Sequence, residues 1–207
     1  MKNRLFAIAV QALETEGWKV ERERGSGKSS VRRITKNRQS KLVTIRTSQD
    51  TWIAFPRTDG DKSWRTLDEV DAVVPVSVDD PENPKFAKVH LIDGDEVRSR
   101  FNRAYKARMD AKRSIPVGRG VWVSLYHQEA KDRVSYVGAG MGIKFPPIAT
   151  VPLSSAQIAA AVDEGDHDAR RGELPAEEAA LSIAEAKRRL AITFGVGPAN
   201  IKITVEA

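Results

Sequence analysis

The chain has 207 residues, of which 41% are hydrophobic and 30% charged, and its formal net charge is +6. This length and composition are ordinary for a globular protein with a buried core. The absence of cysteine excludes disulfides, thiolate metal sites and cysteine nucleophiles. No segment reaches the roughly 18 apolar residues that a membrane span requires. We therefore expect a cytoplasmic, bacterial-type protein without membrane association.

The first quarter of the chain predicts one helix followed by three strands. Apolar residues recur at helical spacing over residues 2–16. The segments 31–35, 42–47 and 51–55 are rich in β-branched and aromatic residues, as strands are. The polar, basic link 36–41 is typical of a hairpin turn. The order indicates a three-stranded meander packed against an N-terminal helix.

The middle of the chain predicts a buried strand and a basic helix. The valine-rich run 70–78 favours a central strand, with 86–92 as its neighbour. Residues 93–112 form a long predicted helix whose leading acidic residues suit an N-terminus. Segments 121–126 and 133–137 indicate a further hairpin.

The prediction is thus an α+β fold with a mixed β-sheet core. We expect a core domain over residues 1–150 and an acidic, alanine-rich linker or helix over 151–180. A small helix–strand unit follows over 181–207, because Ser182 and Glu185 form a capping box before an apolar stripe.

Two glycine-rich segments resemble nucleotide-binding loops without meeting their requirements. Residues 25–30 (Gly-Ser-Gly-Lys-Ser-Ser) have Arg22 where a phosphate-binding loop needs its first glycine, and a strand rather than a helix follows. Residues 138–142 contain three glycines, but their last spacing is one residue short of the dinucleotide fingerprint. We predict ordinary loops at both places.

No catalytic or metal-binding pattern is present in the sequence. The three histidines, His90, His127 and His167, are not at metal-ligand spacing, and we expect His90 to be a structural side chain within a strand. The acidic cluster 163–168 lacks the ordered spacing of a calcium loop. We therefore expect no cofactor and lean against an enzyme.

Charge is distributed in blocks of alternating sign. Residues 19–46 contain ten Lys or Arg and two Glu, and residues 98–119 contain eight Lys or Arg and one Asp. Acidic residues dominate segments 66–97 and 150–186. Clustered cations bind nucleic acid by neutralising phosphates and releasing counterions. The acidic blocks are the competing partners, because they can pair with the same cations within one molecule or across a dimer.

The order of elements over residues 1–110 resembles the restriction-endonuclease-like (PD-(D/E)XK) core, in particular its Holliday-junction-resolvase and homing-nuclease branch. The run Leu42–Ser48 looks like the catalytic strand of that branch, which carries a Gln- or Glu-x-Lys pattern. By this resemblance Thr44 stands at the carboxylate position and Arg46 at the lysine position, while the preceding strand offers Arg33 instead of aspartate. Neither Thr nor Arg holds Mg²⁺, so the resemblance implies a core without its metal site.

The leading hypothesis is a non-catalytic nucleic-acid-binding protein with two basic patches on a degenerate nuclease-like core. Trp18, Trp52 and Trp64 are candidates for stacking on bases. The cations that we predict to contact phosphates are Arg32, Arg33, Lys36, Arg38, Lys41 and Arg46, and in the second patch Arg103, Lys106, Lys112 and Arg113.

Two alternatives remain open. One is a protein-interaction module in which acidic blocks of one copy pair with basic blocks of another to form a homodimer. The other is a divalent-metal-dependent nuclease with an unusual acid set, for which Glu14, Asp71 and Glu82 are the candidates.

Overall fold

The computed structural model describes four stretches of the chain: residues 1–23, 28–58, 62–115 and 120–154. All of them belong to the first of the chain's two units, Met1–Arg170. The linker predicted over 151–180 is described only up to residue 154, and the unit predicted over 181–207 lies outside the described residues. The described part combines helices with a mixed sheet and confirms the α+β prediction.

The N-terminal helix α1 (Lys2–Thr15) forms as its periodicity predicts. Its buried residues recur three and four positions apart and face the sheet, as listed here: Leu5, Ile8, Ala9, Ala12 and Leu13. Gly17 follows the helix with φ of +84°, a left-handed conformation that glycine adopts without steric cost. The chain thereby reverses into the first strand.

The main sheet has seven strands. Six lie in the order β1-β2-β3-β5-β6-β9, and β7 pairs with β5. Their bounds are β1 Lys19–Arg22, β2 Val31–Lys36, β3 Gln39–Ser48, β5 Ala72–Val78, β6 Phe86–Val89, β7 Ile92–Asp93 and β9 Ala149–Pro152. Only β3 and β5 run parallel, with Val43 opposite Ala72 and Ser48 opposite Ser77. All seven residues of β5 are buried, which confirms the predicted central strand.

The meander prediction is wrong for its third strand. Strand β4 (Trp52–Pro56) leaves the main sheet and pairs with β8 (Gly120–Ser124) in a separate two-stranded ribbon. The chain changes direction at Asp50, whose Oδ1 accepts hydrogen bonds from Ser48 Oγ at 2.9 Å and from the Trp52 amide at 3.3 Å. Thr51 adopts a φ of +64° in the same turn. The place beside β3 is consequently taken by β5.

The hairpin predicted over 121–126 and 133–137 is also wrong. The first segment is β8, but the second contains a 3₁₀ turn, η2 (Val134–Tyr136), and the short helix α3 (Met141–Lys144) follows. Strand β8 instead pairs with β4, which lies more than sixty residues earlier in the chain. A further 3₁₀ turn, η1 (Leu67–Glu69), precedes β5.

The basic helix α2 spans Gly94–Asp110 and confirms the prediction over 93–112. Asp93 is its N-cap, because the Asp93 side chain accepts the Asp95 amide at 2.8 Å. Lys112 has a φ of +54° just after the helix. No helix among the described residues is both long and apolar enough to cross a membrane.

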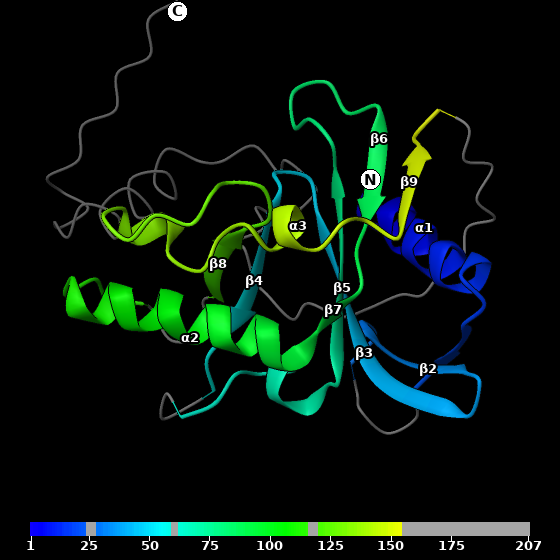
Figure 1. Cartoon of the computed structure of the whole chain (residues 1–207), viewed down its shortest axis with the longest axis horizontal. Helices are drawn as coiled ribbons and strands as arrows, with labels where there is room; N and C mark the ends of the chain where they lie inside the picture. Colours follow the sequence, from blue (N-terminus) through cyan, green and yellow to red (C-terminus); the bar gives the residue numbers. More distant parts are fainter. Residues whose placement is uncertain (24–27, 59–61, 116–119, 155–207) are drawn as a thin grey trace, which may run out of the picture. The chain divides into compact units, whose positions relative to one another are not determined.

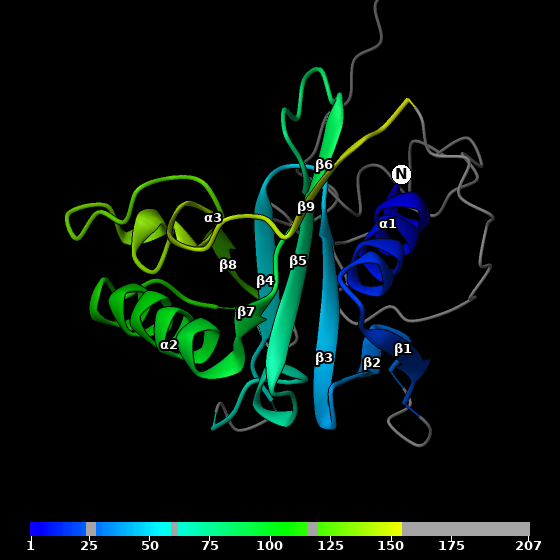
Figure 2. The same ribbon diagram turned by 45° about the vertical axis from the view of Figure 1, so that its right-hand side comes forward.

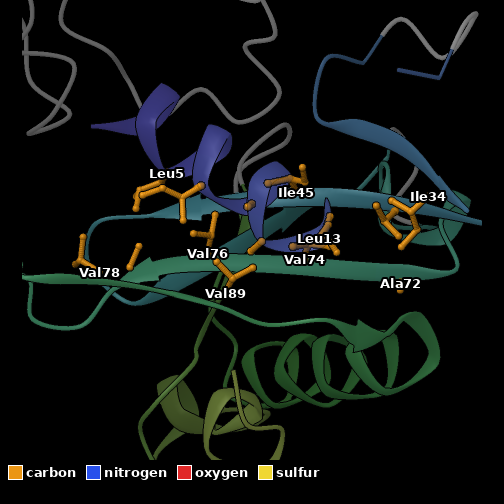
Figure 3. Close-up of a cluster of buried hydrophobic side chains, with 14 of the residues drawn as sticks. Leu5, Leu13, Ile34, Ile45, Ala72, Val74, Val76, Val78 and Val89 are labelled. Atoms are coloured by element: carbon orange, nitrogen blue, oxygen red, sulfur yellow. The ribbon is translucent and has the colours of Figure 1, made fainter. Parts of the chain in front are cut away.

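The two long helices, α1 and α2, cover opposite faces of the main sheet (Figures 1 and 2). Helix α1 packs on one face against the alternate residues of β3 and β5 that include Ile45 and Val74, and Figure 3 shows these side chains converging beneath it. The other face is covered by α2 and the β4–β8 ribbon, with Phe55, Phe101 and Val123 at the centre of that second core. The segment from Val43 to Ile45 of β3 and the whole of β5 are therefore buried on both faces.

Candidate nucleic-acid interface

The strand positions that would carry a nuclease metal site lie on the α2 face of the sheet. Thr44 is fully buried, and its hydroxyl lies 3.4 Å from Ser30 Oγ. The Arg46 guanidinium lies over the Phe55 ring, 4.5 Å from the centroid. No group of three His, Cys, Asp or Glu in the described ranges is arranged to hold a metal ion. The geometry here suits packing, not Mg²⁺ coordination.

The alternative acid set is not brought together. Glu14 is on α1, on the opposite side of the sheet from α2. Asp71 precedes β5 and accepts the Leu42 amide at 2.7 Å, whereas Glu82 follows β5. A seven-residue strand spans roughly 23 Å, so Asp71 and Glu82 lie far apart.

All six predicted cations of the first patch belong to the β2–β3 hairpin. We call four of them the hairpin cations: Arg33, Lys36, Arg38 and Lys41. Lys36 pairs with Gln39 across a two-residue turn in which Asn37 and Arg38 both have positive φ. Residues 37–40 at this tip are all exposed. Strand β5 begins pairing only at Val43, so the tip extends past the parallel strand.

The hairpin cations differ in how firmly they are held. Arg33 makes a two-pronged contact with Glu23, at 2.9 Å from Nε and 3.1 Å from Nη2. The hydrogen bond from Arg33 to Glu23 raises the pKa of the Arg33 guanidinium. Lys36 donates to the Glu16 carbonyl and lies 5.8 Å above the Trp18 ring. Arg38 is exposed at the turn, and Lys41 is half-buried beside Ile34.

Arg32 is placed in the interior instead of on a binding surface. Its relative exposure is 8%, and its guanidinium donates to the carbonyls of Ser29 and Val31 and lies over the Phe6 ring. Together with Arg46, stacked on Phe55, it is unsuited to contact a phosphate in this conformation.

The second predicted patch lies along α2. Arg103 is paired with Glu129 through Nε and Nη2, both at 3.1 Å, and Lys106 is paired with Asp110 at 2.9 Å. The Arg103 hydrogen bond lowers the pKa of Glu129, against the opposing effect of burial. Lys112 and Arg113 follow the helix and are exposed.

The two predicted patches do not form one surface. Helix α2 begins beside β7 and runs away from the β2–β3 hairpin in both views (Figures 1 and 2). Its 17 residues span about 25 Å, so Lys112 and Arg113 lie at the end remote from the hairpin cations. Each patch is therefore treated as a separate site.

The acidic block over 66–97 does neutralise part of both basic stretches. Glu69 pairs with Lys28, and that hydrogen bond lowers the pKa of Glu69 while burial opposes it. Glu96 lies between Arg100, at 2.8 Å, and Lys144, at 3.1 Å. Burial would raise the pKa of Glu96, but the hydrogen bonds from these two cations outweigh it and lower the pKa.

The glycines of residues 138–142 serve close packing. Gly138 has a φ of +83°, and a Cβ there would overlap the backbone carbonyl of Arg100 on α2. A Cβ on Gly142 would lie 2.5 Å from the Tyr126 ring. Arg100, 6% exposed, donates from Nη1 to the carbonyls of Gly138 and Ala139. These contacts support the prediction that the segment is not a dinucleotide-binding loop.

His90 is a buried structural side chain, as predicted, but it lies between β6 and β7 and not within a strand. Its Nδ1 lies 2.8 Å from the Phe145 carbonyl, and its Nε2 lies 2.9 Å from the Tyr126 hydroxyl, which in turn lies 2.9 Å from Ser77 Oγ. Since a carbonyl only accepts, Nδ1 carries the proton and Nε2 accepts from Tyr126. Burial lowers the pKa of His90 and raises that of Tyr126. The chain Ser77–Tyr126–His90–Phe145 is fully satisfied when every member is neutral.

The sequence-predicted tryptophans divide between core and surface. Trp64 is 2% exposed and donates its indole N–H to Asn102 at 2.8 Å, so it is part of the core. Trp18 packs beside the α1 core beneath Lys36. Trp52 is half-buried and lies next to the rings of His127 and Tyr136, which sequence reasoning did not select. Trp122, 37% exposed on β8, was also missed.

Comparison with known proteins identifies no relative. No protein-family model, no curated protein and no solved structure matches this chain.

Proposed function

We propose that this protein binds nucleic acid without cutting it, through cations displayed on a core that resembles restriction-endonuclease-like proteins. The observation that carries the proposal is the β2–β3 hairpin, whose exposed tip and flanking strands carry the hairpin cations. By strand alternation Lys36 and Lys41 share one face of the hairpin, and Arg33 lies on the other. The sequence contains no acidic residue between Glu23 and Asp50, so the hairpin itself supplies no competing carboxylate.

The hairpin has the shape and charge that a nucleic-acid duplex requires. A two-stranded β-ribbon fits into the major groove of B-form DNA. Lysine and arginine on such a ribbon neutralise backbone phosphates and release counterions. The arginine side of the Arg33–Glu23 ion pair is about half exposed, and solvent weakens pairs of this kind by screening their charges. A phosphate is therefore able to replace the Glu23 carboxylate at little cost.

Binding without cleavage is supported by the residues at the resembling strand. The buried Thr44 hydroxyl and the stacked Arg46 guanidinium offer no carboxylate to a divalent ion. We expect no Mg²⁺- or Mn²⁺-dependent cleavage of duplex or single-stranded DNA. Cleavage by the purified chain that is lost in Asp71→Asn would reverse this part of the proposal.

The test is a titration of labelled mixed-sequence duplex, followed by anisotropy, from about 50 to 200 mM salt. The double variant Arg38→Gln/Lys41→Gln is compared with Lys85→Gln, an exposed lysine before β6. We expect the double variant to weaken binding and to reduce the salt slope by up to about 0.9 per lost phosphate contact, and Lys85→Gln to change neither.

Two results would overturn the proposal. One is no binding to duplex or single strands at about 50 mM salt. The other is an equal response of the hairpin variant and Lys85→Gln. A salt-sensitive homodimer in sedimentation, together with no nucleic-acid affinity, would instead favour the protein-interaction alternative.

A further inference from the structure

The β4–β8 ribbon has one apolar face and one face lined with rings. Its inward residues, among them Phe55 and Val123, belong to the core beneath α2. Alternation and the antiparallel register place Trp52 and Trp122 on the other face, since Trp52 is opposite Ser124 and Ala54 is opposite Trp122. The two indoles are therefore diagonal neighbours on the outer face.

Two further rings extend this face from the segment after β8. His127 is stacked on Tyr136, with centroids 4.7 Å apart and planes inclined by 23°. Trp52 lies 5.7 Å from His127 and 6.0 Å from Tyr136. We call Trp52, Trp122, His127 and Tyr136 the ring surface.

One member of the ring surface is fixed by hydrogen bonds, and two of the four rings are exposed. Ser124 Oγ lies 2.8 Å from His127 Nδ1 and accepts the His127 amide at 3.2 Å, which fixes the imidazole beside β8. His127 is exposed, and Trp122 is one of the few large apolar side chains of the described residues that are more than a third exposed. The exposed indole does not stand singly but belongs to a cluster of four rings, and contiguous exposed apolar patches mark interaction sites.

Two neighbouring cations lie beside the ring surface. Arg108 donates from Nη2 to the Trp122 carbonyl at 2.7 Å, and Arg113 lies 3.4 Å from Ser135 Oγ, next to Tyr136. Neither arginine forms an ion pair with a carboxylate of the described segments. Burial lowers the pKa of Arg108, and the nearby charge of Arg113 lowers it further. Two neighbouring like charges without a carboxylate attract an anion.

We infer that the ring surface binds the unpaired bases of a single-stranded nucleic acid, with Arg113 and Lys112 beside its phosphates. Single-strand sites combine stacking rings with cations in this way, since every base has a π-face that stacks without regard to sequence. Bases within a duplex are already stacked on one another and cannot lie on these rings. The inference rests on the proposed function but adds a second, chemically distinct site, remote from the hairpin cations.

The test compares Trp122→Ala with Phe86→Ala, which removes an equally exposed ring, 40% accessible, on β6. Both variants and the unmodified chain are titrated with a labelled 15-residue oligothymidylate and with the mixed-sequence duplex. Loss of one stacked base costs about 5- to 150-fold in affinity. We expect Trp122→Ala to lose oligothymidylate affinity within this range and to bind duplex as before, and Trp122→Phe to retain most of the affinity. Phe86→Ala is expected to bind both as the unmodified chain does.

The outcomes separate this inference from the proposed function. Unchanged oligothymidylate binding in Trp122→Ala, or an equal loss in Phe86→Ala, overturns the ring surface and leaves the hairpin proposal standing. The ring-surface inference alone is also rejected if Arg38→Gln/Lys41→Gln loses duplex binding while neither the unmodified chain nor any variant binds oligothymidylate. Failure of the unmodified chain to bind either nucleic acid rejects both. An oligouridylate of the same length is expected to respond like oligothymidylate, because stacking does not use the sugar hydroxyl.

Discussion

The two faces of the main sheet are built from different chemistry. Under α1 the core is almost entirely hydrocarbon, supplied by leucine, isoleucine, valine and alanine, and Arg32 at its margin is the buried cation. Under α2 and the ribbon the buried residues include Thr44, Ser77 and His90, together with Arg100 in α2 itself. Buried polar groups are tolerated only where each finds a partner, so this face is specified by hydrogen bonds as well as by shape.

The difference indicates which face can evolve a binding site. A hydrocarbon core accepts many side chains of similar volume, whereas a hydrogen-bonded one requires particular residues. The α2 face also carries the ring surface and the cations of the helix end. We therefore regard the α1 face as a hydrophobic support for the sheet. The α2 face is the side on which fewer substitutions are tolerated. Three predictions test this contrast.

The largest effect is expected from Arg100→Met, compared with Leu13→Met on α1. The first change leaves the carbonyls of Gly138 and Ala139 without their donor and removes one of the two cations that hold Glu96. We expect a loss of about 3 kcal/mol or more in the free energy of unfolding. Leu13→Met keeps volume and polarity, so its cost is expected below about 1.5 kcal/mol. Urea unfolding monitored by tryptophan fluorescence measures both.

Equal losses in these two variants would contradict the contrast between the faces. A second variant keeps the prediction testable if Arg100→Met does not fold. Arg100→Lys retains a cation for Glu96 but not the two carbonyl contacts in their fork geometry, and we expect an intermediate loss.

The next effect is a pH dependence of stability that His90 causes. Burial lowers the pKa of folded His90, so between about pH 6.5 and that lower value the unfolded chain binds more protons than the folded chain. Stability is therefore complete above about pH 6.5 and falls as the pH falls through this window. Lys88, the other charged group acting on His90, disfavours the protonated ring in the same sense.

His90→Gln removes this titration. We expect the midpoint temperature of thermal unfolding of the unmodified chain to fall when the pH is lowered from 7.5 to 5.5. We expect a smaller fall for His90→Gln, although this variant is less stable at every pH. Glu96 and Glu129 do not interfere, because their lowered pKa values confine their contribution to a window below about pH 4.5. An identical pH slope in the two proteins would show that His90 is not the group responsible.

Local patterns were sufficient to predict α1, α2 and the central strand. The periodicity of α1, the acids at the start of α2 and the valines of β5 each act within one segment. Patterns within one segment could not predict which strand β4 pairs with. Neighbouring strands usually pair, but here the Asp50 turn redirects the chain and the true partner, β8, is remote in sequence.

The sequence selected candidate residues by their type, cations and rings, but it did not show which of them are exposed and which are paired. Alternation along β2 contained the signal that Arg32 shares a face with the buried Ile34, and alternation along β8 placed Trp122 opposite to its valine neighbours. The pairing of Arg33 with Glu23 and of Arg103 with Glu129 depends on tertiary structure and leaves no local pattern.

The smallest effect on stability, and the most informative one for Arg103, is expected from Glu129→Gln. The carboxylate accepts Arg103 through both oxygens and the Gly138 amide at 2.9 Å through Oε1. Arg103 and Glu129 are 44% and 34% exposed, so their ion pair contributes at most about 1 kcal/mol. Glutamine retains an oxygen for Gly138, which limits the loss further.

Nucleic-acid binding should respond to Glu129→Gln in the opposite direction to stability. Removing the carboxylate releases Arg103, which was predicted from the sequence as a phosphate contact, and also removes a negative charge that repels the ligand. We expect tighter binding of oligothymidylate and a salt slope steeper by up to about 0.7, the value for one added contact to a single strand. Glu82→Gln, in the exposed loop after β5, removes the same charge without releasing Arg103 and controls for net charge. If both variants bind alike, Arg103 is a structural partner of Glu129 only, and the α2 face binds through the ring surface and the helix end without it.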